Sequence, residues 1–230
     1  PGQAVTAYVL GATGFVGREV VRQLAVRATP VVAHVRPKSA AEWTPKLEAL
    51  GAKVDASEWA AAAIAAAIDA AGANQLYILI GTTKGRAKAD SVDGDIYEKI
   101  DYGLTRIAVD AATSSKAKPR LVYLSGLGAD ANARGAYMKA RGKAEDAVRG
   151  SGLEWVIARP AIITGERDES RPGERAGAIV GDGILAVAGL FSNTLKAKWS
   201  STTPDVLASA LIRIGEGSEH DRVFDGQALR

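Results

Sequence analysis

Apolar residues along this chain follow two alternating patterns, one typical of buried strands and one typical of amphipathic helices. Continuous apolar runs occupy residues 6–10, 30–35, 76–80, 121–124 and 154–158, with a weaker run at 52–55. Stretches with helical spacing fall at 15–28, 39–50, 57–72, 94–114, 135–150 and 204–215. Strands that are apolar on both faces and alternate with helices indicate a parallel sheet covered on both sides. Because crossovers are right-handed, the sequence predicts a doubly wound α/β fold.

One segment departs from this alternation. Residues 164–203 carry many glycines, with charges crowded at 166–171. A connection of this length inside a compact domain is usually functional, and it would leave the carboxyl end of the sixth strand, where ligands bind. We therefore predict one domain over residues 1–230, with a small C-terminal region that forms a substrate lid at 164–203. An irregular surface excursion or an oligomer contact is the alternative.

Composition narrows the class of protein. The 230 residues are 47% hydrophobic and 24% charged, as in an ordinary globular domain. Cysteine is absent and there are two histidines, His34 and His220, which argues against a disulfide framework, a thiol nucleophile or a metal site. The apolar runs are too short to span a membrane. We expect a cytoplasmic protein.

The charge pattern bears on the partners. The 29 basic residues are interleaved with 26 acidic ones, so the net charge of +3 indicates a mixed surface and a phosphate-binding site more than nucleic-acid binding. The expected partner is a small-molecule substrate, while a homodimer or a protein partner is left open.

The most informative motif is a glycine-rich turn between the first strand and the first helix. Gly11 would make a tight turn, Gly14 would let backbone approach a pyrophosphate, and Gly17 would let helix and strand pack closely. The helix would direct its free N–H groups at the phosphates. The sequence thus predicts a bound dinucleotide rather than a structural turn, with these contacts: Gly11, Thr13, Gly14, Phe15, Val16 and Gly17.

The residues after the second strand indicate which dinucleotide. Sites for NAD place an acid about 20 residues beyond the glycine turn, at the end of the second strand, but here no acid follows that strand until Glu42. Arg36 offers a planar fork suited to a 2′-phosphate, with Lys38 as a second cation. The sequence therefore predicts NADP(H), unless the two residues are ordinary surface cations.

Two further segments are candidates for cofactor contacts by their position. Asp55 follows the third strand and is placed either to bond an adenine amino group or to lie near a helix N-terminus. Gly81, Thr82 and Thr83 follow the fourth strand, where small residues would let backbone lie along the adenosine ribose.

A candidate chemical site follows the fifth strand. The strand ends at Ser125, and Tyr137 opens the next helix. A carbonyl reductase needs a proton donor, a second hydroxyl beside the carbonyl oxygen, and a cation that lowers the phenol pKa from about 10. Arg141, four residues after Tyr137, returns to the same helix face, whereas Lys139 and Lys143 point away.

The chain as a whole, over roughly residues 5–215, resembles the atypical branch of the short-chain dehydrogenase/reductase superfamily, and within it the Tat-interacting-protein oxidoreductases. The resemblance rests on the glycine turn and on several strings, namely residues 81–86, Ser125 with Gly128-Ala129-Asp130, Arg159-Pro160, residues 169–174 and residues 203–206. It implies a Rossmann-like fold, NADP(H) binding and a Ser/Tyr/Lys active site.

Carried onto this chain, the resemblance implies that Ser125 polarises the carbonyl and that Tyr137 is the acid. Pro160, Ala161 and Ile162 would lie along the nicotinamide. The family's lysine is Arg141 here, and a guanidinium stays protonated, so it cannot join a proton relay. We therefore expect a reductase that acts on a small carbonyl or quinone-like substrate. The alternative is a non-catalytic NADP(H)-binding redox sensor that acts through a protein partner.

Overall fold

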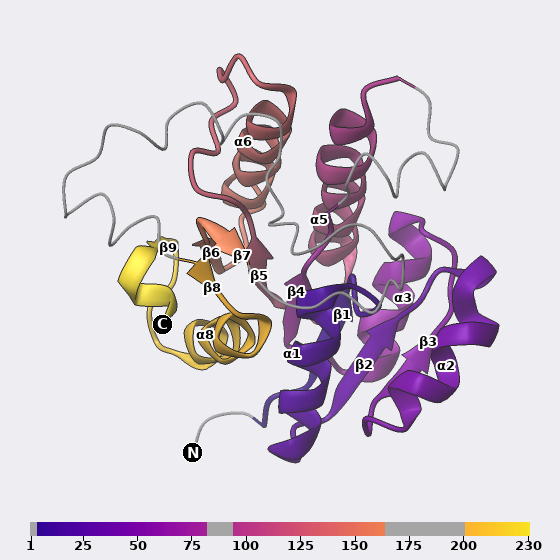
Figure 1. Ribbon diagram of the computed structural model, residues 1–230. Coiled ribbons are helices and arrows are strands. Elements are labelled where there is room, and N and C mark those ends of the chain that lie inside the picture. The colour runs from indigo at the N-terminus through magenta and orange to yellow at the C-terminus, as the bar shows by residue number, and fades with distance from the viewer. Residues whose placement is uncertain (1–3, 82–93, 164–200) are drawn as a thin grey trace, which may run out of the picture.

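In the computed structural model, which describes residues 4–81, 94–163 and 201–230, seven strands form one sheet. The strand order is β3-β2-β1-β4-β5-β6-β9, and every neighbouring pair is parallel (Figure 1). The strands are β1 (Ala7–Leu10), β2 (Val31–His34), β3 (Lys53–Asp55), β4 (Gln75–Ile78), β5 (Arg120–Leu124), β6 (Trp155–Arg159) and β9 (Arg222–Asp225). The predicted doubly wound, Rossmann-like fold is confirmed.

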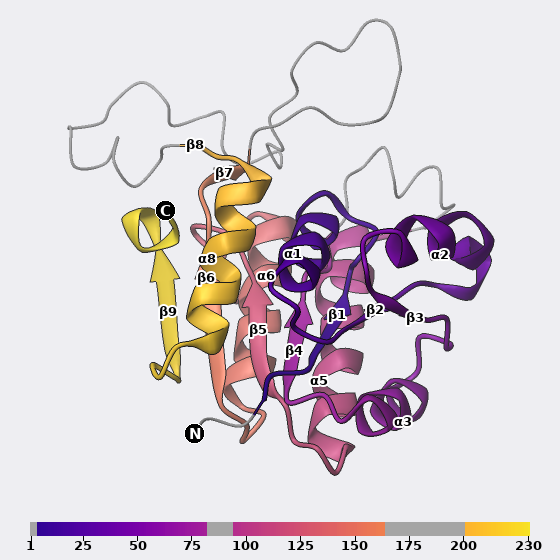
Figure 2. The ribbon, with the colours of Figure 1, turned by 90° about the horizontal axis from the view of Figure 1, so that it is seen from below.

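Helices cover both faces of the sheet (Figure 2). On one face lie α1 (Phe15–Val26), α2 (Ala40–Glu48) and α8 (Pro204–Glu216), which pack over a core containing Val9, Val122 and Val156. On the other face lie α3 (Ala61–Ala71), α5 (Thr105–Ser114) and α6 (Ala136–Arg149). Because both faces are covered, the strands read as continuous apolar runs, and β1 and β4 are buried at every position.

Several elements differ from the sequence-based expectation. The helix predicted at 94–114 is divided into a π-helix, η2 (Tyr97–Leu104), and α5. The edge strand β9 was not predicted, because its sequence Arg-Val-Phe-Asp begins and ends on charged residues. A second, two-stranded parallel sheet pairs β7 (Ile162–Ile163) with β8 (Ser201–Thr202). Short 3-10 turns complete the described fold as η1 (Pro37–Ser39) and η3 (Gly226–Leu229).

The lid predicted at 164–203 lies, for residues 164–200, outside the described residues. Of its last three residues, two form β8 and Thr203 is the N-cap of α8. The lid and the single domain over 1–230 both stay predictions.

The topology determines where a ligand can bind. The strand order reverses direction between β1 and β4, and the registers pair Val9 with Ala33 on β2 and with Tyr77 on β4. The residues that follow these three strands therefore meet at one edge of the sheet, which we call the carboxyl edge. In open α/β sheets, ligands bind outside this edge at the point of reversal.

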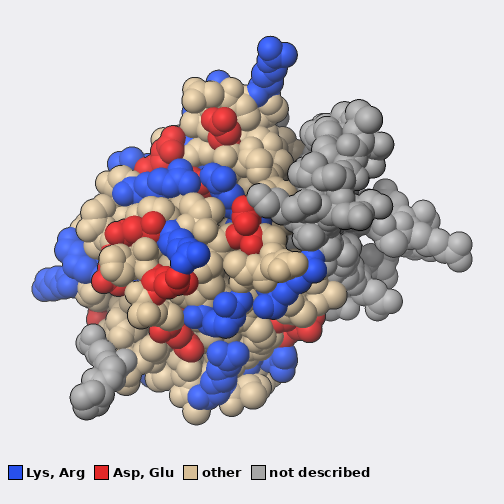
Figure 3. Space-filling view, turned by 90° about the vertical axis from the view of Figure 1, so that its left-hand side faces the viewer, with Lys and Arg blue, Asp and Glu red and all other residues tan. Residues whose placement is uncertain are grey.

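Three properties of the described residues bear on the predicted partners. Within the described ranges, no helix is long and apolar enough to cross a membrane, and no group of three or more His, Asp or Glu side chains could hold a metal ion. On the side of the molecule that lies at the left of Figure 1, basic and acidic side chains interleave (Figure 3).

Candidate functional site

The turn between β1 and α1 requires glycine for reasons of backbone geometry. Gly11 has a φ of 84°, and a Cβ added there would lie 2.5 Å from the Leu79 carbonyl oxygen. A Cβ on Gly17 would lie 2.1 Å from the Gly11 carbonyl oxygen. The Gly14 N–H donates to that same oxygen over 2.9 Å. Gly11 thus permits the tight turn, and Gly17 permits the first turn of α1 to approach it.

The N-terminus of α1 has the properties of an anion site. Its N-cap is Gly14, which supplies no side-chain hydrogen bond, and its first turn contains no acidic residue. The first N–H groups of a helix, here those of Phe15, Val16 and Gly17, have no acceptor within the helix and lie at its positive end. With Thr13 half-buried beside them, these donors fit a diphosphate.

Arg36 and Lys38 lie at the same carboxyl edge. Since Val9 pairs with Ala33, the residues after β1 and β2 end side by side. Arg36 is half-buried and is the N-cap of η1, and Lys38 is exposed within η1. Two basic side chains therefore follow the strand that neighbours the glycine turn.

Asp55 ties β1 to the connection after β3. Its carboxylate accepts the Tyr8 hydroxyl, the Ser57 hydroxyl at 2.7 Å and the Ser57 N–H at 3.1 Å. Burial, followed by the bond to Asp55, raises the pKa of Tyr8 well above its usual value. Asp55 thus has a structural role in addition to the cofactor contact predicted for it.

The remaining predicted cofactor residues follow β4 and β6. Gly81 is exposed and lies three residues beyond the end of β4, whereas Thr82 and Thr83 lie outside the described residues. Pro160 is buried and its carbonyl accepts the Leu127 N–H at 3.0 Å. Ala161 is half-buried, and Ile162 begins β7. Both segments therefore reach the carboxyl edge.

Tyr137 lies in the first turn of α6, next to the residue that follows Ser125. A Cβ added to Gly126 would lie 3.4 Å from the Tyr137 hydroxyl. The Tyr97 ring of η2 meets the Tyr137 ring edge-on, with centroids 5.4 Å apart. The guanidinium carbon of Arg141 is 5.4 Å from the Tyr137 ring centroid. The structure thus brings Tyr137 and Arg141 together.

Arg141 is held in a buried ion pair. Its Nη2 is 2.8 Å from Oδ1 of Asp101, and the two side chains are 6% and 0% exposed. Its Nη1 donates to the Leu124 carbonyl at 2.7 Å and to the Tyr123 hydroxyl at 3.2 Å. Burial lowers the pKa of Arg141, but Tyr137, Tyr123 and Asp101 outweigh it and raise the pKa above its usual value. Arg141 is therefore a permanent cation whose charge is balanced by Asp101.

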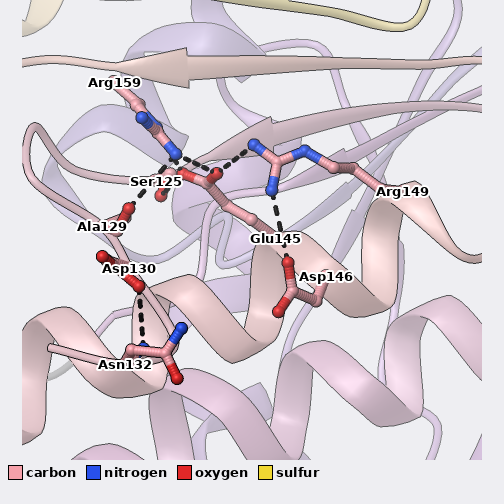
Figure 4. A network of polar contacts seen from close by, with 8 residues as sticks. All are labelled: Ser125, Ala129, Asp130, Asn132, Glu145, Asp146, Arg149 and Arg159. Carbon is pink, nitrogen blue, oxygen red and sulfur yellow. Dashed lines mark hydrogen bonds and ion pairs between the residues drawn. The ribbon is translucent and has the colours of Figure 1, made fainter.

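The structure pairs Ser125 with an acid. Ser125 is 4% exposed, and its hydroxyl donates to Oε1 of Glu145 over 2.6 Å. Glu145 is fully buried and also pairs with Arg149 and Arg159 (Figure 4). The predicted second hydroxyl of the site therefore belongs to a buried polar cluster.

Sequence reasoning missed the two acids. Glu145 follows Arg141 by four residues and Tyr137 by eight, so helical spacing could have found it. Asp101 comes from η2, and only the packing of η2 against α6 brings it to Arg141.

Curated relatives cover most of the chain. It is 32% identical over 215 residues to "Protein fmp52, mitochondrial" from Aspergillus fumigatus, a match that covers 90% of this chain and 85% of that protein. It is also 32% identical over 173 residues to "Protein FMP52, mitochondrial" from Candida albicans, with 72% and 70% covered.

These names contradict the expectation of a cytoplasmic protein, which was wrong. Several relatives at about 30% identity are named mitochondrial proteins, which points to mitochondria. The physical reason for the error is that a cysteine-free, mixed-charge composition excludes disulfides but does not distinguish one reducing compartment from another.

Solved structures and family profiles agree on the fold. ChuY, described as an anaerobillin reductase from Escherichia coli O157:H7, superposes with a TM-score of 0.61 at 19% identity and covers 95% of each chain. The profile of the family described as NAD(P)H-binding matches residues 11–182. With the glycine turn and the doubly wound sheet, this match shows that the chain belongs to the NAD(P)H-binding family and has a Rossmann-like fold.

Proposed function

We propose that the chain is an NADP(H)-dependent oxidoreductase that transfers hydride between the nicotinamide and a small carbonyl or quinone-like substrate. The observation that carries this proposal is the position of Tyr137, a phenol at the carboxyl edge with the Arg141 guanidinium against its ring. A general acid placed next to the nicotinamide is what reduction of a carbonyl requires.

We infer the cofactor contacts from the residues that follow the strands at the carboxyl edge. The N–H groups at the start of α1 would bind the diphosphate, and the Arg36 fork, assisted by Lys38, would bind the 2′-phosphate. Gly81 to Thr83 would lie along the adenosine ribose and Asp55 near the adenine. Pro160, Ala161 and Ile162 would lie along the nicotinamide, which supplies or accepts the hydride when bound.

Tyr137 would handle the proton. In the reducing direction the phenolic proton of Tyr137 would pass to the carbonyl oxygen of the substrate, and water would then restore a proton to the phenolate. Arg141 stays charged, so it orients the phenol without relaying protons. The lid predicted at 164–203 and a homodimer or protein partner are further proposals. The proton transfer described here does not depend on them.

A second function is favoured by one observation. The charge of Arg141 is balanced by Asp101 at 2.8 Å, so the phenol faces an ion pair rather than an isolated cation. Such a site suits a protein that binds NADP(H) without rapid turnover and reports the redox ratio to a protein partner.

The experiment that separates the two functions measures NADPH oxidation with a panel of aldehydes and quinones. Tyr137→Phe should lower kcat by roughly 10²-fold or more, the usual contribution of a general acid. Tyr97→Phe, which removes the hydroxyl of the neighbouring ring, is the control and should change kcat less than about threefold. Arg141→Lys should raise kcat.

Unchanged turnover in Tyr137→Phe would remove that residue from the mechanism. A parent protein that binds NADPH but oxidises it with no member of the panel would support the regulator instead.

A further inference from the structure

We propose that Glu145 is a positioning residue that turns Ser125 away from the substrate, so that position 126 is the one that faces the phenol of Tyr137. This inference rests on the proposed reductase function, and it changes which residues surround the reacting oxygen.

The Glu145 carboxylate is saturated by donors. Its Oε1 accepts the Ser125 hydroxyl at 2.6 Å and Arg159 Nε at 2.7 Å. Its Oε2 accepts Nη2 of Arg159 and Nη2 of Arg149, both at 2.6 Å. A carboxylate offers about four acceptor positions, so each has a partner, as Figure 4 shows. If Ser125 were to turn away, a fully buried charged oxygen would lose a donor, which is costly.

The bond to Glu145 limits what Ser125 can do. A serine hydroxyl has one proton and two lone pairs, and the proton of Ser125 points to Glu145. Polarising a carbonyl oxygen requires a donor. While the bond to Glu145 lasts, Ser125 can only accept, so it cannot polarise the substrate.

Strand geometry places residues 125 and 126 on opposite faces. The pairing of β5 with β6 continues beyond both strands, because the Ser125 N–H donates to the Ala158 carbonyl at 2.8 Å and the Leu127 N–H to the Pro160 carbonyl at 3.0 Å. Successive side chains alternate in such a ladder. Tyr123 lies in the core under α5 and α6, and Leu124 lies in the core under α1 and α8. By this alternation Ser125 faces Glu145 on α6, and position 126 is turned away from Glu145.

The Tyr137 hydroxyl is next to position 126. A Cβ there would lie 3.4 Å from that hydroxyl and 3.8 Å from Cε1 of the ring, which is ordinary contact. The φ of Gly126 is not in the left-handed region, so a serine could take its place without strain. Along α6, Tyr137 and Glu145 are about 12 Å apart, at roughly 1.5 Å per residue. The acid that holds Ser125 is thus two helical turns from the phenol.

The reacting oxygen would consequently be flanked by one hydroxyl, that of Tyr137, and by Gly126, which has no side chain to donate a hydrogen bond.

The test uses the full chain, with turnover of NADPH and melting temperature measured together. Ser125→Ala should keep kcat within about threefold of the parent, and it should lower the melting temperature by roughly 3–8 °C because a buried acceptor loses its donor. Gly126→Ser should raise kcat by about threefold or more, with little change in KM for the substrate, because it adds a donor beside the phenol. Asp146→Asn, in an exposed acid that adjoins Glu145, is the matched control and should change neither quantity.

The two proposals fail in different ways. If Ser125→Ala loses kcat by about tenfold or more at the parent's melting temperature, Ser125 is catalytic and the inference is overturned. A change of less than about twofold in Gly126→Ser overturns it as well. If the parent itself oxidises no NADPH, the reductase proposal fails, but the melting temperatures still decide whether Glu145 holds the Ser125 hydroxyl. Ser125→Ala should lower the melting temperature less in a Glu145→Gln background, where the acceptor is an uncharged amide oxygen, and fully additive losses would contradict the pairing.

Discussion

Two regions of the carboxyl edge are built in different ways. Around β1 and α1 the site consists of backbone, where Gly11 and Gly17 leave no space for a side chain and no acid occupies the first helical turn. Around β5 and α6 it consists of charges, where Arg141 is buried with Asp101 and Glu145 is buried against the partly exposed Arg149 and Arg159. We therefore expect the glycine turn to be disrupted by an added side-chain atom. The charged region should be destabilised when one member of an ion pair is removed.

The largest expected effect is on the charged region. Asp101→Asn leaves the Arg141 guanidinium buried without its counter-charge, which should lower the free energy of unfolding by about 3–5 kcal/mol in urea denaturation. Asp110→Asn is the matched control, because Asp110 pairs with Arg106 on the exposed side of the next helix at 44% and 53% exposure. It should cost less than about 0.5 kcal/mol. Equal losses in the two variants would refute the description of Arg141 as a buried ion-paired cation.

The backbone region should break when one methyl group is added. In Gly17→Ala the new Cβ would overlap the Gly11 carbonyl, so the turn must shift, at a cost of about 1–3 kcal/mol or more. The dissociation constant for NADPH, measured by fluorescence, should rise at least about tenfold, since about 1.4 kcal/mol corresponds to a factor of ten.

Gly135→Ala serves as the control for this prediction. A Cβ there meets nothing within 4 Å, and Gly135 is the N-cap of α6. The change should cost at most about 1 kcal/mol and leave NADPH binding unchanged. Tight NADPH binding by Gly17→Ala would show that the turn is structural.

The difference between the regions also explains what the sequence could reveal. The glycine turn could be predicted from the sequence because its glycine spacing reflects a local backbone constraint between one strand and one helix. The partners of Arg141 and Glu145 could not be predicted in this way, because Asp101 reaches Arg141 from η2 and Arg159 reaches Glu145 from β6. The strand β9 was not predicted for a related reason. It forms by pairing with β6, and its own sequence, with a charged residue at each end, does not indicate a strand.

A smaller effect should appear in the dependence of stability on pH. His34 is 2% exposed at the end of β2, with Nε2 at 2.9 Å from the Ser57 carbonyl oxygen. Burial lowers its pKa, against the opposing effects of Ser57 and Asp55. Below about pH 6.5, the approximate pKa of histidine in the unfolded chain, the unfolded chain binds a proton at His34 and the folded protein does not.

The free energy of unfolding should therefore be independent of His34 titration above about pH 6.5. It should decline as the pH falls from there towards the lowered pKa of His34. Between pH 7 and 5.5 the contribution of His34 should be up to about 1 kcal/mol in chemical denaturation. His34→Gln should remove that part of the decline. A variant with the same decline as the parent would show that His34 makes no such contribution.

The most direct test of the account is a fluorescence titration of the parent protein with NADPH and with NADH. If the α1 N-terminus holds the diphosphate and Arg36 holds the 2′-phosphate, NADPH should bind roughly 10- to 100-fold more tightly, as expected for a charge-assisted bond of about 1.5–3 kcal/mol. Arg36→Ala should remove most of this preference while leaving NADH binding unchanged. Equal dissociation constants for the two cofactors in the parent would contradict the account.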